Sequence, residues 1–344
     1  MTMRRFVILL LVFALVFGVA AHGEGSLSCD TAFNGCVGLP LSWVVESDDE
    51  IVKYELFCDG ASVLELETGD DLFTYTPAKG GQYLLICTLD SGETLQSSEI
   101  TVADKLLMGT YEQDGKEDNG EEPIEWSVLG IDGGKALVIS KHILHNAGYF
   151  NPWWIKYKYT YWAHSYISDF NVNYWGSQPE DPSRRFTVSG SNDIPMEDRT
   201  RGSEEDLYNS ELHCRYWCNS IFYADAFEED ERARILLSHN TNPDNPESRV
   251  KGGPDTDDYV FFLSYEELMK YMPTADSRKT TQTQAALNEG RNNTAQYWWL
   301  RTPGKFRVNA VIVYGNNGHV TLYGTDVGHD AVGYRPCMWI TIGG

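Results

Sequence analysis

The sequence predicts an α+β protein in which an N-terminal β-sandwich is followed by a larger domain of helices and strands. Three observations support this prediction. Residues 38–103 contain short strand-like runs separated by turn residues, which is typical of a β-sandwich. Residues 208–224 place apolar side chains on one face of a helix. The chain from Tyr297 onward is again rich in strand-forming residues.

The length and charge set limits on the function. The chain has 344 residues, which is enough for two domains with a core each. Its formal net charge is -23, and so acidic a surface repels phosphate groups. We therefore expect neither nucleic acid nor an anionic membrane as a partner. The simplest role of the acidity is to keep an exported protein in solution.

The first residues have the features of a secretory signal peptide. Two arginines precede the apolar run Phe6–Val19, which is shorter than a membrane span of roughly 20 residues. Small residues then indicate cleavage after Ala21, with Gly23 as the alternative. We therefore expect a signal peptide over residues 1–21, a secreted or cell-surface protein, and no membrane insertion after cleavage.

The expected strands of the sandwich follow one another between turn residues. They cover residues 41–45, 52–58, 63–66, 73–77, 80–86 and 98–102. An Asp-Gly pair between the second and third strands is a hairpin signal. The arrangement of Thr76, Pro77, Gly81 and Tyr83 resembles that of immunoglobulin-like and PKD-like bacterial modules. This resemblance implies an immunoglobulin-like domain over 38–103 with Tyr83 as its corner tyrosine.

Four of the seven cysteines fall before residue 90. An even set in an oxidising compartment favours disulfides. Cys58 and Cys87 are each in phase with the apolar residues of their strands, so both point to the same kind of face. We expect a Cys58–Cys87 bridge across two strands and a local bridge between Cys29 and Cys36.

The other three cysteines follow in the larger domain. Cys214 and Cys218 are four residues apart on a predicted helix and share a face. A metal site would need further ligands, and the neighbouring His213 points elsewhere on a helix. We expect buried core thiols here. A bridge from Cys214 or Cys218 to Cys337 is the alternative.

The larger domain is expected to begin with an entry loop and a hairpin. The expected elements are a loop over 104–123, a hairpin over 124–140, helices over about 208–224 and 228–236, a buried strand over 259–263, a helix after Ser264, and strands over 297–300, 310–314, 319–323 and 333–342. Ser264 is a good N-cap, and the two glutamates at 266 and 267 suit the helix dipole.

Several motifs of this domain resemble one uncharacterised family. They are Met-Gly-Thr-Tyr at 108–111, Arg-Tyr-Trp-Cys-Asn at 215–219, Trp-Trp-Leu-Arg-Thr-Pro-Gly at 298–304 and Gly-Tyr-Arg-Pro at 333–336. The family is common in secreted proteins of gut Firmicutes and has no assigned activity. The resemblance covers residues 106–342. The order of elements is similar to C-type-lectin-like folds, which implies a C-type-lectin-like α+β domain. Trp299, Arg301 and Arg335 are expected to have structural roles.

Residues 149–175 are unusually rich in aromatic side chains. Tyrosine and tryptophan rings stack on the apolar faces of sugars, and they have polar edges that bind hydroxyls. The candidate ligand-binding residues are Trp153, Trp154, Tyr157, Tyr161, Trp162 and Trp175. The alternative is that these rings pack as core, since large aromatics usually serve burial.

A loop of acidic residues offers a weak calcium site. Asp255, Asp257 and Asp258, with Asp244 before them, supply the hard oxygen ligands that calcium prefers. The simpler interpretation, which we favour, is a turn with a cap. We expect no other cofactor.

No catalytic constellation stands out from the scattered histidines and the abundant acids. The sequence therefore favours a secreted, non-catalytic binding or adhesion module that recognises extracellular glycan. Two alternatives remain. One is a hydrolase or modifying enzyme of lectin-like fold, and the other is a surface component that binds another protein.

Overall fold

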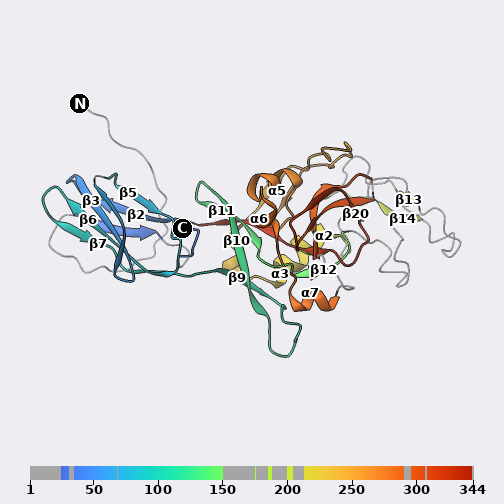
Figure 1. The fold of residues 1–344 in the computed structure, drawn as a ribbon, viewed down its shortest axis with the longest axis horizontal. Helices are drawn as coiled ribbons and strands as arrows, with labels where there is room; N and C mark the ends of the chain where they lie inside the picture. The colour runs from blue at the N-terminus through green and yellow to red at the C-terminus, as the bar shows by residue number, and fades with distance from the viewer. Residues whose placement is uncertain are drawn as a thin grey trace. The chain divides into compact units, whose positions relative to one another are not determined.

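A computed structural model describes residues 25–30, 35–67, 69–149, 175, 185–187, 200–203, 213–289, 296–306 and 308–342. The chain divides into two compact units (Figure 1). The first contains Met1–Lys105 with Ile342–Gly344, and the second contains Leu106–Thr341. The predicted signal peptide, residues 1–21, lies outside the described residues. Within the described part of the chain, no helix is long and apolar enough to cross a membrane.

The first unit consists of two antiparallel sheets. One has the order β1 (Ser26–Asp30), β2 (Leu41–Glu46), β5 (Leu72–Tyr75). The other has the order β4 (Ala61–Glu67), β3 (Ile51–Cys58), β6 (Gly81–Leu89), β7 (Thr94–Gln96), and β8 (Ile100–Val102) also pairs with β6. Side chains alternate between buried and exposed along β2, because successive residues of a strand point to opposite faces.

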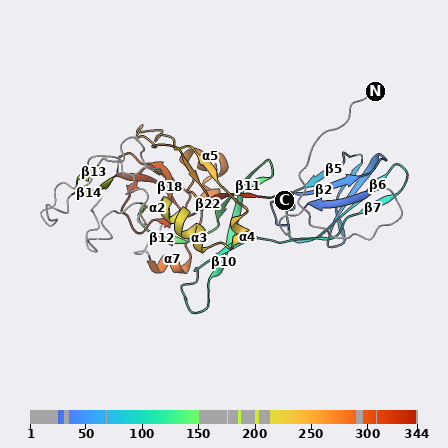
Figure 2. The same cartoon turned by 180° about the vertical axis from the view of Figure 1, so that it is seen from behind.

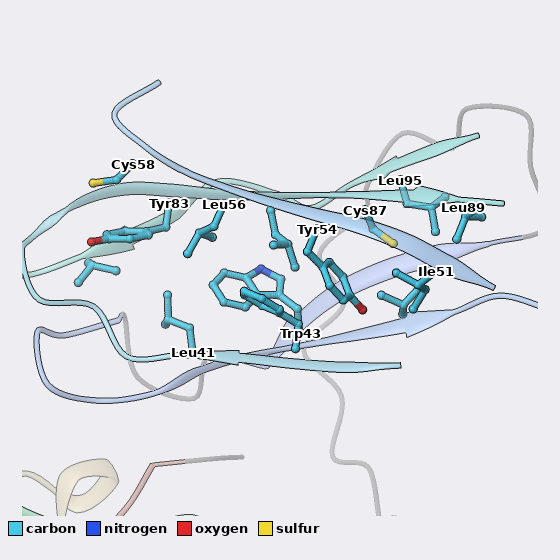
Figure 3. Packing of buried hydrophobic residues seen from close by; sticks show 14 residues of the cluster. Leu41, Trp43, Ile51, Tyr54, Leu56, Cys58, Tyr83, Cys87, Leu89 and Leu95 are labelled. Carbon is cyan, nitrogen blue, oxygen red and sulfur yellow. The ribbon is translucent and has the colours of Figure 1, made fainter. Parts of the chain in front are cut away.

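The core of this unit lies between its two sheets (Figure 3). Trp43 of β2 is completely buried and packs 5.7 Å from Phe73, measured between ring centroids. Tyr54 of the opposite sheet contacts the same Phe73 ring at 4.8 Å. The hydroxyl of Tyr83 donates to the carbonyl of Lys79, four residues earlier in the chain, at 3.0 Å.

The predicted Cys58–Cys87 disulfide is wrong. Cys58 pairs with Tyr83 and Cys87 pairs with Tyr54, so the two cysteines are four residues apart along the paired strands. At about 3.3 Å per residue this is about 13 Å, beyond the span of a disulfide. Figure 3 shows Cys58 at one end of the core, beside Tyr83, and Cys87 well away from it, beside Tyr54. Both side chains point into the core, but they lie at different positions along the paired strands.

The expected Cys29–Cys36 bridge is also contradicted, because Cys36 is a free thiol. Its S–H group donates to the carbonyl of Val37 at 3.4 Å. Burial raises the pKa of this thiol to about 11. The backbone of Cys36 is held separately by a parallel bridge to Ala103.

The second unit contains two five-stranded sheets. The first has the order β15 (Ile235–Leu236), β22 (Cys337–Thr341), β11 (Lys135–Ser140), β10 (Glu122–Asp132), β9 (Leu106–Tyr111). The second has the order β12 (His145–Asn146), β21 (Gly333–Tyr334), β18 (Tyr297–Pro303), β19 (Asn309–Tyr314), β20 (Val320–Asp326). Two small pairs complete the strands, β13 (Arg185–Thr187) with β14 (Thr200–Ser203) and β16 (Ser238–Asn240) with β17 (Thr256–Asp258).

The helices of the second unit are short. They are α2 (Cys214–Tyr216), the π-helix η3 (Trp217–Phe222), α3 (Tyr223–Asp225), α4 (Glu229–Arg232), α5 (Tyr265–Tyr271), α6 (Ala275–Arg278) and α7 (Gln284–Glu289). Helix α7 packs beside β12 (Figure 2). Ser264 caps α5 as predicted, and its hydroxyl accepts from the backbone N–H of Glu267. The β10–β11 hairpin and the terminal strands are also present as expected.

The predicted α+β class, with a C-type-lectin-like second domain, is wrong. The protein is mostly β-structure, 45% strand against 14% helix, and is closer to an all-β, sandwich-like fold. The helix expected over 228–236 ends at Arg232, and Ile235–Leu236 pairs with β22 as a strand instead. Residues 259–263 are largely buried as expected but form only a bridge from Phe261 to Cys337. At Ile235–Leu236, pairing with β22 thus overrides the local preference for helix.

Replacement of Trp43 by alanine should lower the free energy of unfolding by about 3–5 kcal/mol, because it leaves a cavity between the two sheets. Urea unfolding followed by circular dichroism measures this loss. The control is Leu72→Ala in the neighbouring strand β5, where the side chain is 58% exposed and the expected change is below about 1 kcal/mol. Equal effects from both variants would contradict the assigned core.

Candidate functional site

Three tyrosines from neighbouring strands form an open pocket in the second unit. Tyr297 of β18 is the direct cross-strand partner of Tyr314 in β19. Their ring centroids are 4.7 Å apart and the rings meet edge to face. Tyr323 of β20 completes the set. The pocket has a volume of about 340 Å³, and we name it the tyrosine pocket.

The local backbone explains why this sheet surface is open. β20 lies at the edge of its sheet, and most of its residues are only half buried. Gly324 has a φ of +72°, and a Cβ placed there would lie 2.2 Å from the carbonyl oxygen of Ala310. Only glycine fits this close approach. The register shifts between Ala310 and Ile312, and such an irregularity redirects neighbouring side chains.

One lining residue, Tyr323, contacts an aromatic ring and a lysine that lie outside the lining. Tyr323 is 51% exposed, and Phe306 beside it is 48% exposed. Their ring centroids are 5.4 Å apart in an edge-to-face arrangement. The Nζ atom of Lys305 lies 5.2 Å from the Tyr323 ring centroid and 5.7 Å from that of Phe306. Exposed aromatic faces of this kind contact apolar ligand surface.

The polar groups of the pocket are hydroxyls and one imidazole. Thr321 and Thr325 contribute hydroxyl groups to the lining. Burial, and next the neighbouring Tyr314, raises the pKa of Tyr297, so its hydroxyl is protonated at neutral pH. The Nδ1 atom of His329 accepts from the backbone N–H of Ala331 at 3.3 Å, which leaves the ring proton on Nε2. Among the described residues that line the pocket, none is acidic.

A buried carboxylate organises another part of the unit. Asp258 is completely buried, and five side chains donate to its two oxygens. The donors are Arg215 Nε (2.6 Å), Asn219 Nδ2 (3.2 Å), Trp175 Nε1 (2.9 Å), Asn240 Nδ2 (3.1 Å) and Thr256 Oγ1 (2.6 Å). This arrangement satisfies a charge that would otherwise be costly to bury. The carboxylate is therefore a structural hub.

The structure does not assemble the weak calcium site predicted at Asp255, Asp257 and Asp258. Asp257 and Asp258 are neighbours in β17 and point to opposite faces, one exposed and one buried. Asp257 accepts from His239 Nδ1 at 2.9 Å, and Asp255 lies 3.6 Å from Nε2 of the same ring. Alternation along the strand separates Asp258 from the other two carboxylates, which lie beside the His239 ring.

An acidic cluster that sequence analysis missed lies at the start of the unit. One carboxylate oxygen each from Glu112, Asp114 and Glu122 lies within 4.8 Å of the others. These carboxylates already accept hydrogen bonds from backbone N–H groups of the same turn, including those of Gln113 and Lys116. Stabilisation of the turn accounts for the cluster.

The predicted glycan platform is contradicted at its one described residue. Trp175 is completely buried and donates to Asp258, so its role is in the core. Its ring packs 5.2 Å from Phe262 and 6.4 Å from Tyr149, measured between centroids. The other candidate residues, Trp153, Trp154, Tyr157, Tyr161 and Trp162, lie outside the described residues.

Arg301 is buried and uses all of its N–H groups. Its Nη atoms make two bonds to Glu267, of 2.5 and 2.9 Å, in a bidentate pair. The remaining donors reach the carbonyls of Phe262 (2.7 Å) and Thr241 (3.1 Å) and the side chain of Asn242 (3.2 Å). The predicted structural role of this arginine is confirmed.

The other marker residues also have structural contacts. Trp299 donates its indole N–H to the carbonyl of Ala147 at 3.0 Å. Arg335 donates to the carbonyl of Ser140 at 2.8 Å, and its guanidinium lies 5.0 Å from the ring centroid of Trp298. Burial lowers the pKa of Arg335 to about 10. The structural roles predicted for both residues are confirmed.

Cys214, Cys218 and Cys337 are completely buried free thiols. Burial raises the pKa of each well above its ordinary value, which makes them unreactive. The prediction of buried core thiols is confirmed, and the alternative of a bridge to Cys337 is wrong.

The comparisons with known proteins identify one domain. Residues 187–342 match a family described as a domain of unknown function (DUF6273). The match agrees with the uncharacterised domain family expected from the motifs at 298–304 and 333–336. No curated protein matches the chain. The matched region contains β18–β20, and thus the tyrosine pocket, but its description assigns no activity.

Replacement of Asp258 by alanine should lower the free energy of unfolding by about 3–5 kcal/mol, because it removes the acceptor shared by five buried or part-buried donors, including the Arg215 charge. Chemical denaturation monitored by circular dichroism measures the change. Asp257→Ala is the matched control, since this neighbouring side chain is 64% exposed and should cost less than about 1 kcal/mol. If the two variants are equally stable, the hub is misassigned.

Because of the Arg301–Glu267 pair, the free energy of unfolding should depend on pH in the acid range. Burial raises the pKa of Glu267, but the Arg301 charge and hydrogen bonds from Arg301 and Ser264 outweigh it, so the pKa lies below its ordinary 4.5. The stabilisation is therefore complete above pH 4.5 and is lost as pH falls through the lowered pKa.

We expect the stability difference between the wild type and Glu267→Gln to be constant from about pH 7 to 5 and to shrink below pH 4.5, as measured by urea unfolding at each pH. Glu266→Gln, a change at an exposed neighbour in the same helical turn, should show no such dependence. A Glu267→Gln difference that grows in acid would reverse the assigned sign.

Proposed function

We propose that this protein is a secreted, non-catalytic binding module that recognises extracellular glycan through the tyrosine pocket. The observation that carries the proposal is the pocket itself, in which Tyr297, Tyr314 and Tyr323 gather on an open sheet surface. Its volume of about 340 Å³ falls in the range of small-molecule sites, roughly 300–1,000 Å³. The signal-peptide features of residues 1–21 support the extracellular part of the proposal.

The chemistry of the pocket suits a sugar ring. One face of a pyranose presents C–H groups, which pack on exposed rings such as Tyr323 and Phe306. The sugar hydroxyls find partners in Thr321, Thr325 and the protonated hydroxyl of Tyr297. A neutral sugar therefore exchanges its water contacts for equivalent ones and buries its apolar face.

The charge distribution around the pocket favours neutral or acidic sugars over amino sugars that are cationic. The described lining residues include no carboxylate, although the chain as a whole has a net charge of -23. Lys305, outside the lining, adds one positive charge beside Tyr323. A carboxylated or sulfated sugar would gain from this cation, whereas an ammonium group would find no counter-charge there.

Tyr323→Ala should abolish or weaken binding at least about tenfold on a glycan array probed with the exported protein, because it removes the most exposed ring of the pocket. Tyr323→Phe should bind almost normally, since it keeps the stacking face. Tyr265→Ala, in helix α5, is the matched control.

A Trp153→Ala/Trp154→Ala double variant tests whether glycan binds at the tyrosine pocket or at the aromatic segment of residues 149–175. Glycan binding that this double variant loses and Tyr323→Ala retains would contradict the proposed site. A protein that binds no glycan would contradict the proposed function.

A further inference from the structure

A second hollow lies between the edge strand β9 and the helices α3 and α4. It has a volume of about 440 Å³. Its apolar surface includes Leu107, which is 52% exposed, and Pro123. Its acidic surface comprises Asp225, Glu228, Asp230 and Glu231. We name this hollow the acidic groove.

Two of the four carboxylates already have structural tasks. Glu231 accepts from the backbone N–H of Gly109 at 2.8 Å and from that of Glu228 at 3.0 Å. The Glu228 side chain caps the first turn of α4 in return. By contrast, the side-chain carboxylates of Asp225 and Asp230 form no hydrogen bond or ion pair with any described residue. These two charges are available to a ligand.

No cation of the described chain neutralises the groove from within its lining. The closest basic residue in sequence, Arg232, directs its guanidinium to the carbonyls of Ala224 (3.0 Å) and Phe227. Arg232 keeps its positive charge there, but the four carboxylates of the lining outnumber it. The groove therefore keeps a negative potential, and a positively charged group would be attracted to it.

The spacing of the acids argues for a long cation and against a metal ion. In the described chain, three acidic or metal-ligating side chains approach within 4.8 Å only at Glu112, Asp114 and Glu122, outside the groove. Lysine and arginine combine an aliphatic stem with a charged head. The stem fits against Leu107 and Pro123, while the head reaches the carboxylates.

We propose that the acidic groove docks a lysine- or arginine-bearing segment of a partner protein. Recognition is by side chains and not by addition of a strand to β9. The reason is that the edge N–H groups of Gly109 and Thr110 are already bonded, to Glu231 and to the carbonyl of Ala226. The site is independent of the tyrosine pocket, which is built from β18–β20 and residues close to them in the chain.

The test uses the exported protein and a fluorescein-labelled peptide of sequence Gly-Lys-Leu-Lys-Leu-Lys-Gly, with fluorescence anisotropy at low salt as the readout. Asp225→Asn/Asp230→Asn should weaken binding about tenfold, because two ion pairs are lost. Leu107→Ser should also weaken it, at unchanged charge. Since both sets of residues are exposed, the variants should keep their folded circular dichroism spectra.

Asp48→Asn/Asp49→Asn is the matched control, because it removes the same charge from exposed positions in the first unit. It should leave binding within about twofold of the wild type. If both double variants weaken peptide binding equally, the loss depends only on the net charge of the protein, and the proposal is overturned. An unchanged affinity in Leu107→Ser, or displacement of the peptide by calcium at equal ionic strength, would also overturn it.

Discussion

The ion pair between the buried Arg301 and the part-buried Glu267 is the interaction on which the second unit depends. Arg301 joins β18 to helix α5 and to the carbonyls of Thr241 and Phe262, so one guanidinium fixes segments that are distant in the sequence. Burial of a guanidinium is costly unless its donors are satisfied, as all five N–H groups of Arg301 are. Because β18 begins with Tyr297, the same pair fixes the strand from which the tyrosine pocket is built.

Local chemistry made part of this fold predictable. Ser264 as a helix cap and the β10–β11 hairpin depend on residues close in sequence, and both are found where expected. Contacts that depend on register were not predictable. Cys58 and Cys87 share a face but lie opposite different residues. The pairing of Tyr297 with Tyr314 likewise follows from strand order, although a tyrosine near the end of each strand was a visible signal.

Amino-acid composition gave wrong predictions for residues whose role depends on whether they are buried. Trp175 belongs to an aromatic segment that suggested a binding surface, yet it donates to Asp258 in the core. Asp258 itself belongs to an acidic run that suggested calcium, yet it is saturated by protein donors. The two candidate surfaces instead differ in chemistry, one aromatic with no acidic lining residue and one acidic with an apolar side, which suits two different classes of ligand.

The most direct measurement is ¹⁹F NMR of protein labelled with 3-fluorotyrosine and titrated with a glycan selected on the array. We predict that the resonances of Tyr297, Tyr314 and Tyr323, assigned by Tyr→Phe variants, shift together with one affinity. Tyr223 and Tyr259, which stack on each other at 4.5 Å elsewhere in the unit, should stay unchanged. Shifts confined to tyrosines within residues 151–174 would contradict the account.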